Sequence, residues 1–275
     1  MRRFLVISIS MCVFLHEISA QSFEEFVTKS YEYSDANNLV LAEDCLKAAL
    51  QLEPTNKLNY FLLNNLGTIQ RRQGKYEDAL FSYSAALKQK PNDELILINR
   101  AELFSITNEI DKAIYDYNTL IINNPTHEQG RFSRGLLHIN KGDYLLAEVD
   151  FSFIIDTNDD TFLGRFGYAI LEKARENFIL SENIFKYLAE KYPNHTRLLE
   201  ERAELFFLTK RNARAMADLN KVFAVTPEPS AELYMLRGRV KLARSEKESA
   251  AVDFKKARDL GYDIETVDLL LKESF

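Results

Sequence analysis

Residues 128–158, EQGRFSRGLLHINKGDYLLAEVDFSFIIDTN, contain two segments in which apolar side chains recur every three or four positions. This spacing places the apolar side chains on one face of a helix, so the stretch predicts two amphipathic helices. The turn between them is Lys141-Gly142-Asp143. The expected inner faces carry Phe132, Leu136, Leu137 and Ile139 in the first helix, and Tyr144, Ala147, Phe151, Ile154 and Ile155 in the second.

The same pattern recurs along the chain about every 34 residues, and such self-similarity indicates a repeat architecture. A proline follows the second helix, where it prevents the helix from continuing. These prolines are Pro54, Pro91, Pro125, Pro193 and Pro227, with Asp159 at the one missing place. A small residue in the second helix recurs as Ala42, Ala79, Ala113, Ala147, Ser181, Ala215 and Ala250. Four residues later comes a large apolar side chain: Leu46, Tyr83, Tyr117, Phe151, Phe185, Leu219 and Phe254. A small residue in the first helix recurs as Gly67, Ala101, Gly135, Ala169, Ala203 and Gly238.

A helix–turn–helix unit of this length and pattern resembles the tetratricopeptide repeat, and the resemblance covers nearly the whole chain after residue 20. The resemblance implies an all-α fold, a right-handed superhelical solenoid. We count about seven repeats, starting near residues 23, 60, 94, 128, 162, 196 and 231. Residues 263–274 predict a final amphipathic helix that covers the last apolar face, as stacked repeats require. No low-complexity linker interrupts residues 21–275, so we expect one domain.

Four repeats carry an arginine in the first helix and an aspartate sixteen residues later in the second. Two other repeats have neither residue, which favours pairing within a repeat over pairing between repeats. Partly buried charges are normally paired, because an unpaired buried charge is costly. We therefore interpret these residues as structural ion pairs that fix the register of the two helices. The expected pairs are Arg100 with Asp116, Arg134 with Asp150, Arg202 with Asp218 and Arg237 with Asp253.

The first twenty residues have the composition of a secretory signal peptide. Arg2 and Arg3 precede an apolar run from Phe4 to Leu15, and small residues follow before Gln21. We expect cleavage after Ala20, and with it a periplasmic or secreted location. The alternative is a retained membrane anchor, although the run is short for a membrane span.

The sequence contains no recognisable catalytic, metal-binding or cofactor-binding motif. His127, His138 and His195 recur at no metal-ligand spacing, and phosphate-cradling glycine loops are missing. Cys45 has no neighbouring histidine and is expected to be a buried, inert thiol. The net charge of −6 argues against nucleic acid as a partner. We therefore expect a protein that is not an enzyme, with no metal, no small-molecule cofactor, and membrane contact only through partners.

The resemblance also implies a concave groove lined by the first helices, in which a protein or peptide partner would lie. At the groove positions the middle repeats carry Ile98, Phe132, Leu136, Ile139, Phe166 and Ile170, which would form an apolar patch. Polar residues would form its rim: Asn64 and Arg71 on one side, Glu200 and Glu204 on the other. An exposed apolar patch with a polar rim is typical of a binding site for a peptide or helix. The alternative is that neighbouring helices cover these side chains, which would then belong to the core.

These observations favour a non-enzymatic scaffold or adaptor that is exported and helps to assemble or position an envelope or secretion complex. A second hypothesis is an accessory subunit that holds or regulates an envelope enzyme or transport system. A third is a catalytic protein whose site matches no known motif.

Overall fold

A computed structural model gives the structure of residues 22–274, and in this range all regular secondary structure is α-helix. The predicted signal segment, residues 1–20, lies outside the described residues. The helices are α2 (Phe23–Asp35), α3 (Leu39–Leu52), α4 (Asn59–Arg72), α5 (Tyr76–Gln89), α6 (Glu94–Ile106), α7 (Ile110–Asn123), α8 (Glu128–Lys141), α9 (Tyr144–Thr157), α10 (Phe162–Ala174), α11 (Phe178–Lys191), α12 (Thr196–Leu208), α13 (Asn212–Val225), α14 (Ala231–Leu242), α15 (Lys247–Asp259) and α16 (Ile264–Glu273).

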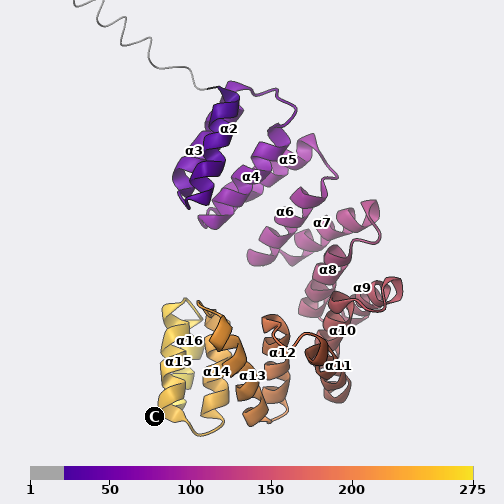
Figure 1. Cartoon of the computed structure of the whole chain (residues 1–275), viewed down its shortest axis with the longest axis vertical. Coiled ribbons are helices and arrows are strands. Elements are labelled where there is room, and N and C mark those ends of the chain that lie inside the picture. The colour runs from indigo at the N-terminus through magenta and orange to yellow at the C-terminus, as the bar shows by residue number, and fades with distance from the viewer. Residues whose placement is uncertain (1–21, 275) are drawn as a thin grey trace, which may run out of the picture. The chain divides into compact units, whose positions relative to one another are not determined.

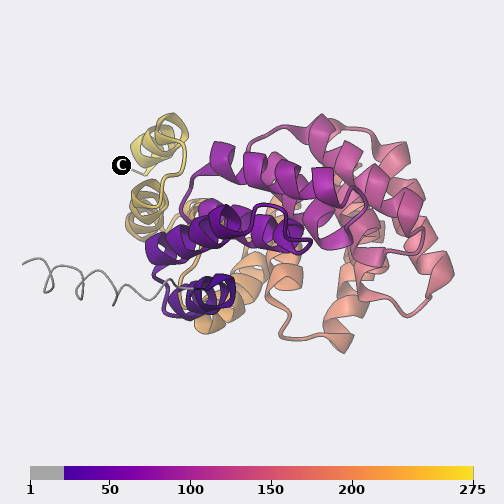
Figure 2. The ribbon, with the colours of Figure 1, turned by 90° about the horizontal axis from the view of Figure 1, so that it is seen from above.

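Successive helices pair into hairpins, and each hairpin packs against the next within a compact unit (Figure 1). The chain divides into two such units with the boundary at Gly130, inside α8, whereas the sequence predicts a single domain. In the first unit, α2/α3 packs on α4/α5, and Figure 2 shows these indigo and violet helices side by side. In the second unit, the hairpins α10/α11, α12/α13 and α14/α15 follow one another, and α16 packs on α15.

Each hairpin turn has the same backbone geometry, and this geometry decides where the first helix ends. One residue of the turn has a positive φ, as in Gly74 (75°) and Gly142 (78°). The amide of the following residue then donates to a carbonyl five residues back, for example from Lys75 to Gln70 at 2.9 Å. This is the Schellman arrangement, which satisfies the free carbonyls at a helix end. The equivalent residues with positive φ are Asn37, Asn108, Glu176, Lys210 and Ser245.

In three hairpins, a glycine of the first helix faces an aromatic ring of the second. A Cβ added to Gly67 would lie 2.7 Å from the Tyr83 ring, and one added to Gly238 would lie 2.5 Å from the Phe254 ring. Both rings are fully buried. Because interiors are packed at crystal-like density, only glycine fits at this distance. The series of small and large residues seen in the sequence therefore marks the helix–helix contact inside each repeat.

Ion pairs also connect one hairpin to the next, and the sequence pattern does not reveal them. The carboxylate of Glu43 in α3 is buried and accepts hydrogen bonds from Gln73 at 2.9 Å and Lys75 at 2.7 Å in the next hairpin. In the second unit, Glu182 in α11 similarly accepts a hydrogen bond from Arg211 at 2.5 Å. A glutamate of a second helix thus holds the turn region of the following hairpin.

Burial alone would raise the pKa of Glu43, but its hydrogen bonds outweigh that effect. Hydrogen bonds from Lys47 of α3, and from Lys75, Gln73 and Gln70 of the next hairpin, lower the pKa to about 2. The ionised form of this buried carboxylate is therefore favoured in the folded protein.

The helix α16 covers the apolar end of the last hairpin. Val267 is fully buried, and Leu270 and Leu271 pack beside it on the cluster that contains Met235 and Phe254. Within residues 22–274, no helix is both long enough and apolar enough to span a membrane.

Candidate binding site between α12 and α14

The central residues of the predicted apolar groove belong largely to the core of the second unit. Phe132 and Phe166 are 2% and 1% exposed, and Ile170 is also buried. The rings of Phe132 and Phe166 stack with centroids 6.1 Å apart, because the same face of successive first helices packs together. The expectation of an exposed patch is therefore wrong for these three residues. Leu136 and Ile139 are half-buried against the same core.

The remaining predicted groove and rim residues of the first unit are partly or fully buried there or contact other side chains of that unit. Ile98 is half-buried. Asn64 is buried, and its Oδ1 accepts a hydrogen bond from Asn99 at 2.8 Å. Arg71 forms an ion pair with Glu102 at 2.8 Å. These polar side chains stabilise neighbouring first helices in the unit that carries them.

All four predicted Arg–Asp pairs are present, each as a two-pronged contact between the helices of one hairpin. The nitrogen–oxygen distances are 2.8 and 2.7 Å for Arg100–Asp116, 2.8 and 2.5 Å for Arg134–Asp150, 2.7 and 2.7 Å for Arg202–Asp218, and 2.8 and 2.6 Å for Arg237–Asp253. The four carboxylates are buried. The geometry is the fork-to-fork arrangement that gives arginine pairs their directional strength. These residues hold the hairpins together and are not part of an open site.

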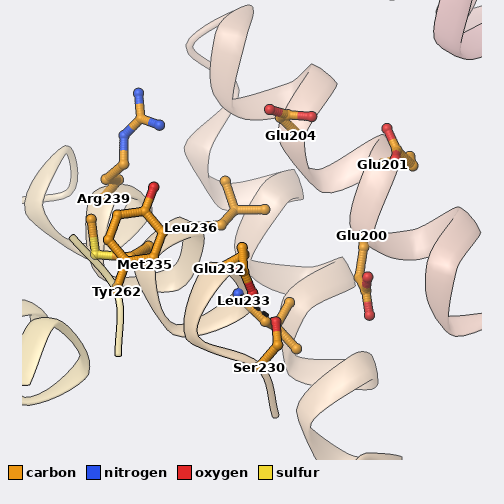
Figure 3. A pocket seen from close by; sticks show the side chains of 10 residues that line it. All are labelled: Glu200, Glu201, Glu204, Ser230, Glu232, Leu233, Met235, Leu236, Arg239 and Tyr262. Carbon is orange, nitrogen blue, oxygen red and sulfur yellow. Dashed lines mark hydrogen bonds between the residues drawn. The ribbon is translucent and has the colours of Figure 1, made fainter. Parts of the chain in front are cut away.

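The two rim residues predicted in the sixth repeat line an open pocket of about 320 Å³ in the second unit. Glu200 and Glu204, with Glu201 between them, form one wall from helix α12 (Figure 3). The opposite side and the floor come from α14 with the residue that precedes it, and from the loop before α16. They consist of Ser230, Glu232, Leu233, Met235, Leu236, Arg239 and Tyr262. The pocket therefore combines an acidic wall with an apolar floor.

The charges of the acidic wall are only partly compensated. Lys173 of α10 donates to Glu201 at 2.6 Å and also to Glu204. Burial by itself would lower the pKa of the Lys173 ammonium group. The two carboxylates outweigh this effect of burial, so the pKa is raised. Glu200 and Glu232 form no ion pair with any residue in the range 22–274. Burial raises the pKa of Glu200, the charge of Glu201 adds to this rise, and Arg197 opposes it.

The three histidines of the described range lie at helix starts or in the protein interior. The Nδ1 atoms of His127 and His195 accept hydrogen bonds from the amides of Gly130 (2.9 Å) and Leu198 (3.3 Å) near the starts of α8 and α12. His138 is buried, and burial lowers the pKa of its imidazole.

The other chemical groups of the described chain likewise form no recognisable reaction centre. Cys45 is a buried free thiol whose pKa burial raises. In the described part of the chain, no cluster of three or more His, Cys, Asp and Glu side chains is placed to hold a metal ion.

Comparisons with known proteins agree with this architecture. The profile of the tetratricopeptide repeat matches residues 60–93. A solved tetratricopeptide repeat protein from Parabacteroides merdae is 51% identical, with a TM-score of 0.82 and coverage of 93% of this chain and 99% of that chain. The chain belongs to the tetratricopeptide repeat family, whose members typically bind protein or peptide partners. A comparison with curated proteins gives no match.

Two more distant structures share the fold alone. The APC/C hetero-tetramer Cut9–Hcn1 is 16% identical, with a TM-score of 0.64 over 95% of this chain and 58% of that chain. PilW, a type IV pilus biogenesis factor, is 19% identical, with a TM-score of 0.59 over 77% of this chain and 98% of that chain.

Proposed function

We propose that this chain is an exported, non-enzymatic scaffold that binds a segment of a partner protein and so assembles or positions an envelope or secretion complex. The observation that carries the proposal is the open pocket on the first helices of the sixth and seventh repeats, in a fold whose members bind proteins. The predicted apolar patch is mostly core, so the binding surface moves to α12 and α14. The pocket is lined by no histidine or cysteine, and no cluster of described residues is placed to hold a metal ion, which supports binding over catalysis.

Export is supported by the sequence of the first twenty residues, with two arginines, an apolar run and small residues before Gln21. The role in an envelope or secretion complex draws support from the fold shared with PilW, a type IV pilus biogenesis factor. At 19% identity this likeness concerns architecture.

Two measurements on the full chain test the proposal. The first is expression with a C-terminal tag, cell fractionation and intact-mass analysis. The expected product lies outside the cytoplasm and begins at Gln21. A cytoplasmic product that retains Met1 would refute export.

The second measurement is cross-linking in intact cells, followed by mass spectrometry of the captured peptides. We expect one dominant protein partner, cross-linked to lysines on the second unit. If no protein is cross-linked above the background of a control exported protein, the scaffold role is refuted. A captured enzyme or transporter whose activity changes on binding would instead support the accessory-subunit hypothesis.

A further inference from the structure

The residue that distinguishes the pocket from the rest of the array is Glu200. The repeat register places it where the two preceding repeats have Phe132 and Phe166. Those two phenylalanines are buried and stacked on each other. At the equivalent place in the sixth repeat, the array carries a half-buried carboxylate instead. A position at which one repeat carries a charged residue where its neighbours carry a packed apolar residue is expected to serve a purpose other than stability.

Glu200 forms no ion pair in the described range, although the nearby charge of Arg197 partly offsets its own. Lys173 forms ion pairs with Glu201 and Glu204, whereas Glu200 and Glu232 have no ion-pair partner in the described range. Arg239 at the far side of the pocket lies over the ring of Phe207, 4.8 Å from its centroid. The four carboxylates outnumber the three nearby cationic side chains, Lys173, Arg197 and Arg239, so the pocket attracts positive charge. Partly buried carboxylates are stabilised by a cation that donates hydrogen bonds to them.

The floor of the pocket adds a second requirement, for an apolar side chain. Leu236 points into the space between the acidic wall and Tyr262 (Figure 3). Leu233 and Met235 lie beneath, buried, and Tyr262 is half-buried at the edge. A small polyamine would satisfy the carboxylates but leave this surface exposed to water, which is unfavourable. A peptide with basic and apolar residues side by side would satisfy both parts.

We propose that the pocket between α12 and α14 binds a cationic, amphipathic segment of a partner protein. A lysine or arginine of the segment pairs with Glu200 and Glu232, and an adjacent apolar side chain packs on Leu236 and Tyr262. This inference rests on the proposed scaffold function and specifies the chemistry of its partner. It predicts a partner of opposite charge to the acidic chain, with binding that weakens as salt screens the carboxylates.

The test uses the full chain after signal removal and a fluorescein-labelled peptide, Gly-Ser-Leu-Lys-Leu-Leu-Lys-Leu-Ser-Gly, in fluorescence anisotropy. We expect saturable binding that weakens with added salt. A peptide with glutamate in place of both lysines should not bind. A peptide with serine in place of the leucines should bind at least about tenfold more weakly, a change of about 1.4 kcal/mol.

Two substitutions locate the site. E200Q removes the charge but keeps the shape and should weaken peptide binding by about tenfold, the scale of one charge-assisted contact. E190Q removes an exposed carboxylate of α11 outside the pocket and is the matched control, with unchanged affinity. E200L should raise the melting temperature, because it restores an apolar residue at this packing position, while it weakens binding. Loss of binding with a raised melting temperature separates a ligand-binding role from a structural one.

Other outcomes would overturn the inference. Equal effects of E200Q and E190Q would show that the peptide binds through the general acidity of the chain. Tight binding of the serine peptide or of spermidine, with the same E200Q dependence, would mean a cation site without an apolar component. If the wild-type chain ignores the leucine–lysine peptide yet still cross-links one protein in cells, this inference fails while the scaffold function stands. If the peptide binds but no protein is cross-linked in cells, the scaffold function fails while the chemistry inferred for the pocket stands.

Discussion

Replacing Asp150 by alanine should be among the most destabilising single changes in the second unit that leave the apolar core untouched. The Asp150 carboxylate is 1% exposed and accepts three hydrogen bonds from charged donors. Two come from Arg134 at 2.8 and 2.5 Å, and one comes from Arg131 at 3.2 Å. The substitution removes the acceptor that both arginines share and leaves two largely buried guanidinium groups next to each other.

The size of the effect follows from the geometry. Removing one partner of a buried ion pair costs about 3–5 kcal/mol. The side chain of Arg134 is 17% exposed, so water partly solvates it after the change, and we take the lower end of that range, about 3 kcal/mol. Asp218 holds a single arginine, Arg202, and its replacement by alanine should cost less, about 2 kcal/mol. Asp159 is 90% exposed, and its replacement should change the free energy of unfolding by less than about 0.5 kcal/mol.

Thermal and urea unfolding, followed by circular dichroism, measures the three variants side by side. A loss of about 3 kcal/mol corresponds to a fall in Tm of roughly 6–12 °C for a chain of this size. The expected order of destabilisation is D150A, then D218A, then D159A. Equal melting temperatures for D150A and D159A would show that the buried ion pair contributes nothing to stability. If D218A were the least stable variant, the cost would not follow the number of hydrogen bonds that each aspartate accepts.

Three further predictions concern packing and pH. F166E should prevent cooperative folding, because an ionised carboxylate would replace a ring that is 1% exposed, and a wild-type melting curve would contradict the assignment of Phe166 to the core. G167A should lower the unfolding free energy by about 1–3 kcal/mol, because its Cβ would lie 2.3 Å from the Phe151 ring, and an unchanged urea midpoint would refute this clash. Glu43 has a pKa of about 2 in the folded protein against an ordinary value of 4.5, so its stabilising contribution is complete above that ordinary value and declines as pH falls toward 2. The stability advantage of wild type over E43Q in urea should therefore be larger at about pH 7 than at about pH 3, and a constant difference would contradict the lowered pKa.

The repeat and the Arg–Asp pairs could be predicted from the sequence because each depends on one spacing within one hairpin. Gly135 and Phe151, or Arg237 and Asp253, lie sixteen residues apart in every repeat that carries the pattern. Two helices of fixed length joined by a fixed turn convert that spacing into contact. A regular spacing within one hairpin therefore predicts which side chains contact each other in the structure.

Contacts between hairpins could not be predicted in the same way. Phe132 and Phe166 have the spacing of groove residues, but their burial depends on how closely one first helix approaches the next. In the following hairpin Glu43 pairs with two glutamines and a lysine, whereas Glu182 pairs with two arginines, so the partner of the glutamate differs from one clamp to another.

The pocket could be predicted only in part, for a related reason. Glu200 and Glu204 lie at groove positions, so the sequence places them on the rim. Tyr262 comes from the loop before α16, and Glu232 lies in the first turn of α14, where the pattern assigns no role. A departure from the repeat rule, glutamate where phenylalanine precedes, was the one signal that could have drawn attention to this site.

The hairpin turns imply that local stability is distributed unevenly along the chain. In each turn one residue adopts a left-handed conformation, which costs an ordinary residue about 1–2 kcal/mol but costs glycine nothing. The first four turns use residue types that tolerate it and the last three do not: Asn37, Gly74, Asn108 and Gly142, then Glu176, Lys210 and Ser245. In the last three hairpins, packing between the helices must therefore overcome the conformational cost of the turn. Their backbone amides should exchange with solvent through local opening sooner than those of earlier hairpins. The candidate pocket is built on two of these hairpins, so a ligand that bridges α12 and α14 would also suppress their opening.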